Sequence, residues 1–356
     1  MRKINFLLIS LVVFLAFFGL LMIYDASSFV AFRDFADKYH YIREQFIWVI
    51  LGFISLAFFS LFSYKKLYNL ALPILLVTIL SLFLVFVPGL GVSLLGAKRW
   101  VNLRFFVLQP SEIVKLSLAI YLAAWFSNKE KGRFLAFSLL LGLILLLVML
   151  QPDMGTTGII LTEAIVIYFL SGASLSHFSL LMPLIAVASF VLIKIAPYRA
   201  NRLTTFLNIN QSPQNFSYHI RQILIALGSG GLTGVGLGNS LQKYAYLPEN
   251  TTDSIFAIIG EEFGFLGGFF IILLFLVLIW IGFYIAMRAK DKFGMLLAGG
   301  ISTFLAAQIL INLGAQTALL PLTGVPLPFI SYGGSALLIN FSAVGILINI
   351  SKSIKK

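Results

Sequence analysis

The sequence predicts an all-α fold, a polytopic membrane bundle of about ten transmembrane helices. Only 11% of the 356 residues are charged and 60% are hydrophobic, whereas an average chain carries about 25% charged residues. Apolar stretches of ~18 residues or more recur along the chain, and each could cross a hydrocarbon core of ~30 Å as a helix. Because these stretches are continuous rather than alternating, they favour helices over the strands of a membrane barrel.

The first apolar stretch, MRKINFLLISLVVFLAFFGLLMIY, begins like a secretory signal peptide. Its apolar run is too long for one, and no small-residue cleavage site follows, so we interpret it as the first span. No soluble domain is evident, and we predict one integral-membrane domain over 1–356 with a long extracytoplasmic loop at about 196–253. The predicted spans are approximately 4–24, 45–62, 67–87, 109–126, 134–150, 155–171, 176–195, 254–285, 296–319 and 329–350.

Basic residues gather in short turns between alternate spans, and this pattern predicts the orientation. These turns and the two termini hold 13 of the 25 Lys and Arg residues, and only Glu130 and Asp291 join them. The positive-inside rule therefore places both termini in the cytoplasm. The basic segments are Arg2–Lys3, Lys65–Lys66, Lys129/Lys131/Arg133, Arg288/Lys290/Lys292 and Lys352/Lys355/Lys356.

The polar stretches rich in glycine and proline all fall on the outer side in this topology. The connection over 196–253 carries Tyr, Phe and Leu, so we expect it to be partly helical and packed. The stretch PLTGVPLPFISYGG holds too many prolines and glycines for a helix, and we predict a re-entrant or cavity-lining loop. The other outer stretches are GAKRWVNLRFFVLQPSE and QPDMGTT. Any chemistry should therefore face the periplasm or the cell exterior.

Asp253 stands at the entrance of the eighth span, in LPENTTDSIFAIIGEEFGFLGG. One interpretation is a plain helix start, in which Thr251 and Thr252 cap the helix and the carboxylate favours its positive end. The other is a functional carboxylate on a seam of small residues that faces the interior of the bundle. That seam would comprise Asp253, Ala257, Gly260, Gly264 and Gly267, spaced along one helix face.

We single out four further ionisable residues within the predicted spans. Glu261 and Glu262 lie about two turns into the eighth span, where a charge costs roughly 2.5–3.5 kcal/mol on insertion scales, and we favour a buried ion pair. Glu112 and Lys115 are three residues apart and share a helix face. They could form a local ion pair, or Lys115 could be a cation lining a cavity for a phosphate.

Further polar residues mark the outer side. Asp153 precedes the sixth span, either as a helix cap or at the opening of a cavity. Basic residues on this side run against the charge bias, and lipid headgroups or an anionic ligand such as a pyrophosphate would explain them. They are Lys98, Arg99, Arg104, Arg199, Arg202, Arg221 and Lys243.

Several kinds of chemistry are excluded or disfavoured. The chain has no cysteine, which excludes disulfides and thiolate catalysis. His40, His177 and His219 lack metal-ligand spacing. GSGGLTGVGLGNS lacks the strand that precedes a dinucleotide-binding loop, so we expect tight turns and close backbone packing there. No basic and aromatic pattern indicates a nucleic-acid partner.

Five motifs in this order resemble the SEDS family (shape, elongation, division and sporulation), and the resemblance covers nearly the whole chain. The motifs are GAKRWVNL, QPSEIVK, QPDMGTT, GSGGLTGVGLGNSLQKYAYLPENTTDSIFAIIGEEFGFLGG and LPLTGVPLPFISYGG. The resemblance implies a peptidoglycan glycosyltransferase of the bacterial cytoplasmic membrane. It implies polymerisation of lipid II at the outer face with release of undecaprenyl pyrophosphate. It also implies a class B penicillin-binding protein as partner, beside other divisome or elongasome membrane proteins.

The resemblance carries roles onto single positions. The family's essential acid falls on Asp253, the lysine of its QPSE–K motif on Lys115, and the aspartate of its PD–GT motif on Asp153. The arginine of its RW pair is Arg99. We further expect four residues at the substrate site, Glu112, Arg202, Glu249 and Lys243. Three positions depart from the family pattern, Thr251 for His, Ser254 for Phe and Ala336 for Ser, which puts substrate contacts in doubt but removes no charge.

The implied reaction is attack of a GlcNAc 4-hydroxyl on the anomeric carbon of MurNAc, with inversion. A base beside the attacking oxygen contributes ~10²–10⁴-fold, and we predict Asp253 in that role. The helix dipole would lower the pKa of Asp253, while burial would raise it. No cofactor is certain; Mg²⁺ or Mn²⁺ is compatible with a pyrophosphate leaving group, although no ligand cage is visible.

Subtype and function leave alternatives. Three stretches resemble the division type of the family, FtsW: YDASSFVAF, YIREQFIW and GLGNSLQKYAYLPE. One stretch, TGVPLPFISYGG, is more similar to the elongation type, RodA. We favour the division type. A lipid II flippase would also need buried charges and a headgroup cavity. A non-catalytic scaffold for the penicillin-binding protein would not need Lys115, Asp153 or Asp253.

Overall fold

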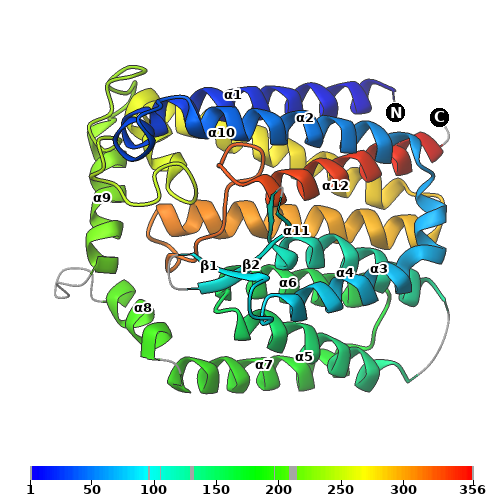
Figure 1. The fold of residues 1–356 in the computed structure, drawn as a ribbon. Coiled ribbons are helices and arrows are strands. Elements are labelled where there is room, and N and C mark those ends of the chain that lie inside the picture. The colour runs from blue at the N-terminus through cyan, green and yellow to red at the C-terminus, as the bar shows by residue number, and fades with distance from the viewer. Residues whose placement is uncertain are drawn as a thin grey trace.

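A computed structural model describes residues 2–94, 97–104, 106–128, 132–195, 197–207 and 215–354. Long helices lie side by side in a bundle, and a small sheet and two short helices lie at one end of it (Figure 1). The long helices are α1 (Arg2–Phe35), α2 (His40–Leu61), α3 (Tyr64–Leu84), α4 (Pro110–Ser127), α5 (Phe134–Leu150), α6 (Met154–Leu170), α7 (Leu175–Ile195), α10 (Ile255–Arg288), α11 (Lys292–Gln316) and α12 (Gly334–Ser353). The shorter elements are α8 (Pro197–Leu207), α9 (Asn215–Ser229), β1 (Gly91–Leu94), β2 (Ala97–Asn102) and β3 (Val107–Leu108).

Each of the ten predicted spans overlaps one long helix, so the helical membrane fold is confirmed. Within the described residues, seven helices are long and apolar enough to cross a bilayer by length and composition: α1, α2, α3, α7, α10, α11 and α12. The apolar helices α5 and α6 have 17 residues each. The 18-residue helix α4 carries Glu112 and Lys115, and both of these side chains are buried within the bundle.

The helices differ in how deeply they lie in the bundle. In α11 and α12, 78% and 83% of the most apolar window is buried, because α11 packs on α4, α6 and α10 while α12 packs on α2. In α7 the corresponding share is 6%, and Leu181 is the buried residue of that helix. The core therefore forms around α11 and α12, and α7 lies at the lipid-facing edge.

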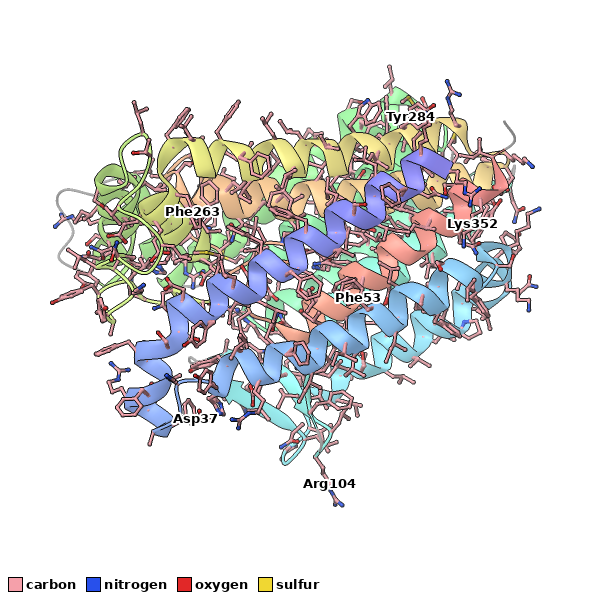
Figure 2. The ribbon with its side chains drawn as sticks, turned by 90° about the horizontal axis from the view of Figure 1, so that it is seen from above. Asp37, Phe53, Arg104, Phe263, Tyr284 and Lys352 are labelled. Atoms are coloured by element: carbon pink, nitrogen blue, oxygen red, sulfur yellow. The ribbon has the colours of Figure 1, made fainter. Side chains whose placement is uncertain are left out.

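The two ends of the bundle differ in chemistry, as the orientation rule predicts. Asp37 and Lys352 lie at opposite ends (Figure 2). At the basic end, hydrogen bonds join the short turns: Lys352 Nζ donates to the Ser60 carbonyl (2.8 Å) and Lys292 Nζ to the Ser171 carbonyl (3.0 Å). The predicted basic positions Lys129, Lys131, Lys355 and Lys356, with the acidic Glu130, lie outside the described residues.

The polar end contains a small antiparallel sheet that the sequence analysis did not predict. Its strand order is β1-β2-β3, and Gly91 pairs with Val101, which in turn pairs with Leu108. The strands are two to six residues long, too short for an alternating pattern to stand out. The sheet includes most of the GAKRWVNL motif; Gly96 and, just beyond it, Phe105 lie outside the described residues.

The connection between α7 and α10 is partly helical and packed, as predicted. Ile220, Ile223 and Ala226 of α9 are buried, and α9 packs on α10. Residues 196 and 208–214 lie outside the described part, as does the side chain of Arg199. After α9 the chain turns repeatedly from 230 to 254 before it enters α10.

The glycine run after α9 packs into a break in α10. Gly264 has φ 67° and ψ −167°, a conformation reserved for glycine, and an added Cβ would lie 2.3 Å from the Gly234 nitrogen. Val235 and Gly236 donate to the carbonyls of Glu261 and Glu262 (both 3.0 Å), which the break leaves free of their helical partners. The predicted close backbone packing is therefore confirmed.

The predicted small-residue seam is wrong beyond Gly260. The break at Gly264 changes the direction of the backbone, so Gly264 and Gly267 no longer share one helix face with Ala257 and Gly260. An added Cβ at Gly267 would meet Phe263 of its own helix, not a neighbouring one (2.2 Å).

Candidate active site

Asp253 lies in a turn just before α10, and the predicted capping role is wrong. The helix begins at Ile255 after Ser254, which makes no side-chain capping bond, and Gln316 Oε1 accepts instead from the Ala257 N–H (2.7 Å). Residues 249–254 fold around the Glu249 carbonyl, which accepts from the Thr252 and Ser254 N–H groups (3.2 and 3.1 Å). The threonine side chain is therefore turned towards the acids of this turn and away from the helix start.

Two carboxyl groups meet one hydroxyl in this turn. Thr252 Oγ1 lies 3.0 Å from Glu249 Oε2 and 3.0 Å from Asp253 Oδ1. Glu249 has φ 50°, the left-handed region that non-glycine residues rarely occupy. Such strain persists where the surrounding structure enforces it, and it is frequent at functional sites.

A ladder of amides on α11 holds the turn in place. Asn312 Nδ2 donates to the Asp253 carbonyl (3.0 Å) and to the Val325 carbonyl (2.7 Å). Gln316 Nε2 donates to Asn312 Oδ1 (2.7 Å). Gln308, one turn earlier, donates to the Pro326 carbonyl (2.9 Å). The sequence analysis missed these residues, although polar side chains four apart in a membrane span are a signal in themselves.

The proline- and glycine-rich loop after α11 closes over the same turn. Residues 317–333 are not helical, as predicted. Ser331 Oγ donates to the Thr252 carbonyl, and the Tyr332 N–H donates to the Thr251 carbonyl (2.9 Å). A Cβ at Gly324 would lie 3.9 Å from Asp253 Oδ2, so this loop forms a wall beside the carboxylate.

Two of the predicted arginines act electrostatically on Asp253. Arg99 of β2 donates to the Gln151 carbonyl (3.2 Å) and to the Pro152 carbonyl, and Arg202 of α8 donates to the Leu322 carbonyl (3.3 Å). Burial raises the pKa of the Asp253 carboxyl, while the Thr252 hydrogen bond and the charges of Arg202 and Arg99 oppose that rise. Burial therefore prevails, which resolves the question that the sequence left open.

Glu249 and His219 have perturbed protonation as well. Burial, and after it the charge of Asp253, raise the pKa of Glu249. Burial lowers the pKa of His219 to about 4, so this imidazole is neutral at neutral pH. His219 Nε2 lies 2.7 Å from Ser254 Oγ, a contact that joins α9 to the residue after Asp253.

Asp153 is the N-cap of α6, so its capping interpretation is confirmed. Its Oδ1 accepts from the Thr156 N–H (3.1 Å), and its Oδ2 accepts from Gln109 and Ser111 at the start of α4 (both 3.2 Å). The side chain is buried. It therefore ties the outer ends of α4 and α6 together.

Lys115 and Glu112 form the predicted local ion pair. Lys115 Nζ lies 2.7 Å from Glu112 Oε2 and donates to Gln308 Oε1 (2.7 Å). Lys115 has no exposed surface, so the alternative of a cation lining a cavity does not describe this structure. Lys115 also acts electrostatically on Glu163 of α6, a buried carboxyl that has no hydrogen-bond partner within the described residues and that the sequence analysis did not single out.

Lys243 does not point towards the candidate site, contrary to its prediction as a substrate contact. Its Nζ binds Asp25 of α1 (2.8 and 3.0 Å) and Glu262 of α10 (3.1 Å), because two carboxylates beside the break in α10 need a cation. The ion pair predicted for Glu262 is confirmed. Glu261 accepts instead from Ser240 Oγ and the Leu241 N–H (3.2 Å), and the described residues show no ion pair for it.

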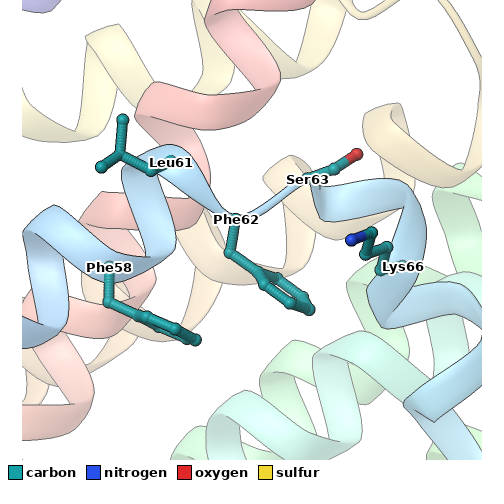
Figure 3. Close-up of a pocket in the computed structure, with 5 residues that line it drawn as sticks. All are labelled: Phe58, Leu61, Phe62, Ser63 and Lys66. Atoms are coloured by element: carbon teal, nitrogen blue, oxygen red, sulfur yellow. The ribbon is translucent and has the colours of Figure 1, made fainter.

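Two pockets in the surface lie away from the turn that carries Asp253. One, of about 380 Å³, is lined by Phe58, Leu61, Phe62, Ser63 and Lys66 where α2 turns into α3 (Figure 3). The other, of about 360 Å³, includes Arg133, His177 and Lys292. Both lie at the basic end, and none of the predicted site residues lines them. In the described ranges, no three His, Asp or Glu side chains group as metal ligands.

Comparison with known proteins supplies the family. Residues 5–356 match the FtsW/RodA/SpoVE family, described as cell cycle proteins. The chain belongs to this family, which confirms the SEDS resemblance. The match covers every element described above apart from the first turn of α1.

Curated relatives and a solved structure agree. The chain is 39% identical to stage V sporulation protein E of Bacillus subtilis, over 98% of this chain and 97% of that protein. It is 37% identical to the probable peptidoglycan glycosyltransferase FtsW of Geobacter metallireducens, over 99% and 96%. A chain from a solved peptidoglycan synthase complex shares the fold, with a TM-score of 0.78 at 24% identity over 99% and 97%. Similarity to FtsW agrees with the division type that the sequence favours.

Proposed function

We propose that this protein is a peptidoglycan glycosyltransferase that polymerises lipid II into glycan strands during cell division or elongation. The family and the names of its relatives support this activity. The observation that carries the assignment of the site is the turn at Asp253, where a partly buried carboxyl with a raised pKa lies among arginines at the polar end of the bundle. Undecaprenyl pyrophosphate is the leaving group.

In the proposed reaction the 4-hydroxyl oxygen of the acceptor GlcNAc attacks the anomeric carbon of the donor MurNAc. The bond from that carbon to the pyrophosphate oxygen breaks, and its electron pair leaves with the pyrophosphate. The hydroxyl proton passes to Asp253. A sugar hydroxyl is a weak nucleophile, and a well-placed general base contributes ~10²–10⁴-fold. Because its pKa is raised, Asp253 is a stronger base than an ordinary exposed aspartate.

Arg99 and Arg202 are the cations proposed for the leaving group. Both act electrostatically on Asp253, which puts positive charge near the reacting atoms. Positive groups that are already in place stabilise charge that develops in a transition state. Glu249 and Asp153 remain predicted parts of the substrate site, while Lys115 and Glu112 would support it from within the bundle.

The partners and the side of the membrane belong to the same proposal. The charge bias puts the turn of Asp253 on the outer side, where the disaccharide of lipid II would be presented. A class B penicillin-binding protein is the proposed partner, since the related fold occurs in a complex that coordinates polymerization with crosslinking. Other divisome or elongasome membrane proteins would complete the assembly.

A divalent cation would fit this site only together with its substrate. The described residues offer no cluster of three His, Asp or Glu ligands. Mg²⁺ is commonly held by one or two carboxylates together with substrate phosphates. We therefore propose that a divalent cation, Mg²⁺ or Mn²⁺, would enter this site bound to the pyrophosphate oxygens of the substrate.

The test is polymerisation of purified lipid II. The protein, isolated with its penicillin-binding partner, should produce glycan strands, and Asp253→Ala should produce none while it remains folded and bound to the partner. Strands made by Asp253→Ala at the normal rate would refute the role of Asp253. Transport of labelled lipid II across vesicle membranes without polymerisation would support a flippase instead, and normal growth with Lys115, Asp153 and Asp253 all replaced would support a scaffold.

A further inference from the structure

The turn before α10 presents more hydrogen-bond acceptors than one hydroxyl can serve. Thr252 Oγ1 is within hydrogen-bonding distance of three oxygens, the Glu249 carbonyl (3.3 Å), Glu249 Oε2 (3.0 Å) and Asp253 Oδ1 (3.0 Å). A threonine hydroxyl has a single proton to donate but can also accept a hydrogen bond. The contacts with the two carboxyl groups therefore cannot both be donations from Thr252.

The two 3.0 Å contacts of Thr252 Oγ1 favour a proton on one of the two carboxyl groups. If both carboxyl groups were ionised, one of the two 3.0 Å contacts would bring a carboxylate oxygen against a hydroxyl lone pair. Two nearby carboxylates also raise the cost of ionising both, and such pairs hold a proton between them. If one group is protonated, it donates to Thr252 Oγ1 while the Thr252 hydroxyl donates to the other, so both contacts are satisfied.

The surroundings decide which carboxyl holds the proton. Arg202 and Arg99 act on Asp253 and favour its ionised form. The neighbour of Glu249 on α9 is His219, which is neutral at neutral pH and supplies no opposing charge. The ionisable and charged groups that face the pair are Tyr41 of α2, Arg99 of β2, Arg202 of α8 and His219 of α9.

We propose that Glu249 is protonated in the resting enzyme and that, through the Thr252 hydroxyl, it orients Asp253 and keeps it ionised for proton abstraction. This inference rests on the proposed glycosyltransferase function, and it makes Glu249 a positioning residue. When Asp253 takes the sugar proton, the pair holds two protons. Asp253, which is partly exposed, then releases that proton to water while Glu249 keeps its own, and the resting state returns.

Variants of Glu249 distinguish a protonated side chain that donates a hydrogen bond to Thr252 from an ionised carboxylate. In the lipid II assay, Glu249→Ala should lower kcat by about 10²-fold, at the lower end of general-base effects. Glu249→Gln should recover at least about tenfold of that loss, because its amide N–H can donate to Thr252 Oγ1 as a protonated carboxyl does. Wild-type kcat should fall at alkaline pH as Glu249 ionises, and Glu249→Gln should lack this fall.

Thr252 provides the matched pair of variants. Thr252→Ser keeps the hydroxyl and should keep the alkaline fall in kcat, whereas Thr252→Val should lose both the fall and most of kcat. Thermal unfolding of each variant, measured with its partner, excludes a loss of fold. If Glu249→Gln is as inactive as Glu249→Ala while the wild type polymerises and Asp253→Asn does not, this inference is overturned and the proposed function stands. If the wild type makes no polymer, the proposed function itself fails.

Discussion

Two groups of acids that lie close together in the sequence, between Glu249 and Glu262, have opposite surroundings. Glu261 and Glu262, beside the break in α10, receive an ammonium from Lys243 and hydrogen bonds from Ser240 and Leu241. Glu249 and Asp253, in the turn before α10, share the hydroxyl of Thr252. The first group is buried; the second is partly exposed.

The difference separates a structural from a chemical role. A carboxylate whose oxygens are occupied by an ammonium and by N–H or O–H donors fixes the elements that supply those groups. A carboxyl that is partly buried with few donors has a raised pKa and can accept one at neutral pH. Four acids in one short stretch of sequence thus divide into two pairs. Glu262 holds α10 to α1 through Lys243 and Glu261 holds α10 to the preceding loop, whereas Glu249 and Asp253 form a pair that can move a proton.

The largest expected effect comes from removing the cation of the structural pair. Lys243→Met leaves Asp25 and Glu262 facing each other without a cation. Breaking a buried ion pair by loss of one partner typically costs about 3–5 kcal/mol, so the unfolding temperature in detergent should fall sharply. Lys243→Met combined with Asp25→Asn and Glu262→Gln should recover most of this loss. A normal unfolding temperature for Lys243→Met alone would refute the structural assignment.

Loss of an amide from the ladder on α11 should lower both the folding stability and kcat. Asn312→Ala removes the donor to the Asp253 carbonyl and should cost about 1–3 kcal/mol of folding stability. Because the turn that carries Asp253 then loses its fixed position, kcat of the folded variant should also fall, by about ten- to hundredfold. Ser302→Ala is the control, since its hydroxyl bonds back to Ala298 in its own helix. Equal activity of the two variants would show that the ladder does not position Asp253.

His219 should have the smallest effect at neutral pH and a larger one in acid. Its pKa is lowered to about 4 in the folded protein, below the ordinary 6.5, because it is buried. The unfolded chain therefore takes up a proton first as the pH falls, so stability is complete above about 6.5 and is lost towards 4. His219→Gln removes this component, and its unfolding temperature should decline less than that of the wild type between about pH 7 and 5, a range that includes the upper limit of this window. Equal declines would contradict a buried neutral His219.

Much of the fold and part of the site can be predicted from local sequence, that is, from composition and from residues a few positions apart. Continuous apolar runs identify the ten long helices, because these depend on composition alone. The basic turns predict which end faces the cytoplasm on the same basis. The Glu112–Lys115 pair and the cap at Asp153 are also predictable, since each depends on residues a few positions away.

Other features depend on contacts between distant parts of the chain. Lys243 is bound by Asp25, 218 positions earlier, and such a partner leaves no local signal in the sequence. The caps expected at Thr251 and Thr252 fail because Gln316 takes over the start of α10. The break at Gly264 depends on a distant loop, because Val235 and Gly236 donate to the carbonyls of Glu261 and Glu262.

The central claim is that Asp253 acts chemically while Glu262 acts structurally, and one paired measurement tests it. Asp253→Asn and Glu262→Gln are each isolated with the partner protein, and each sample is measured for lipid II polymerisation and for its unfolding temperature. The account predicts that Asp253→Asn unfolds like the wild type but makes no glycan strands, whereas Glu262→Gln is altered in stability and still polymerises when folded. Glycan strands made by Asp253→Asn at the wild-type rate would contradict it.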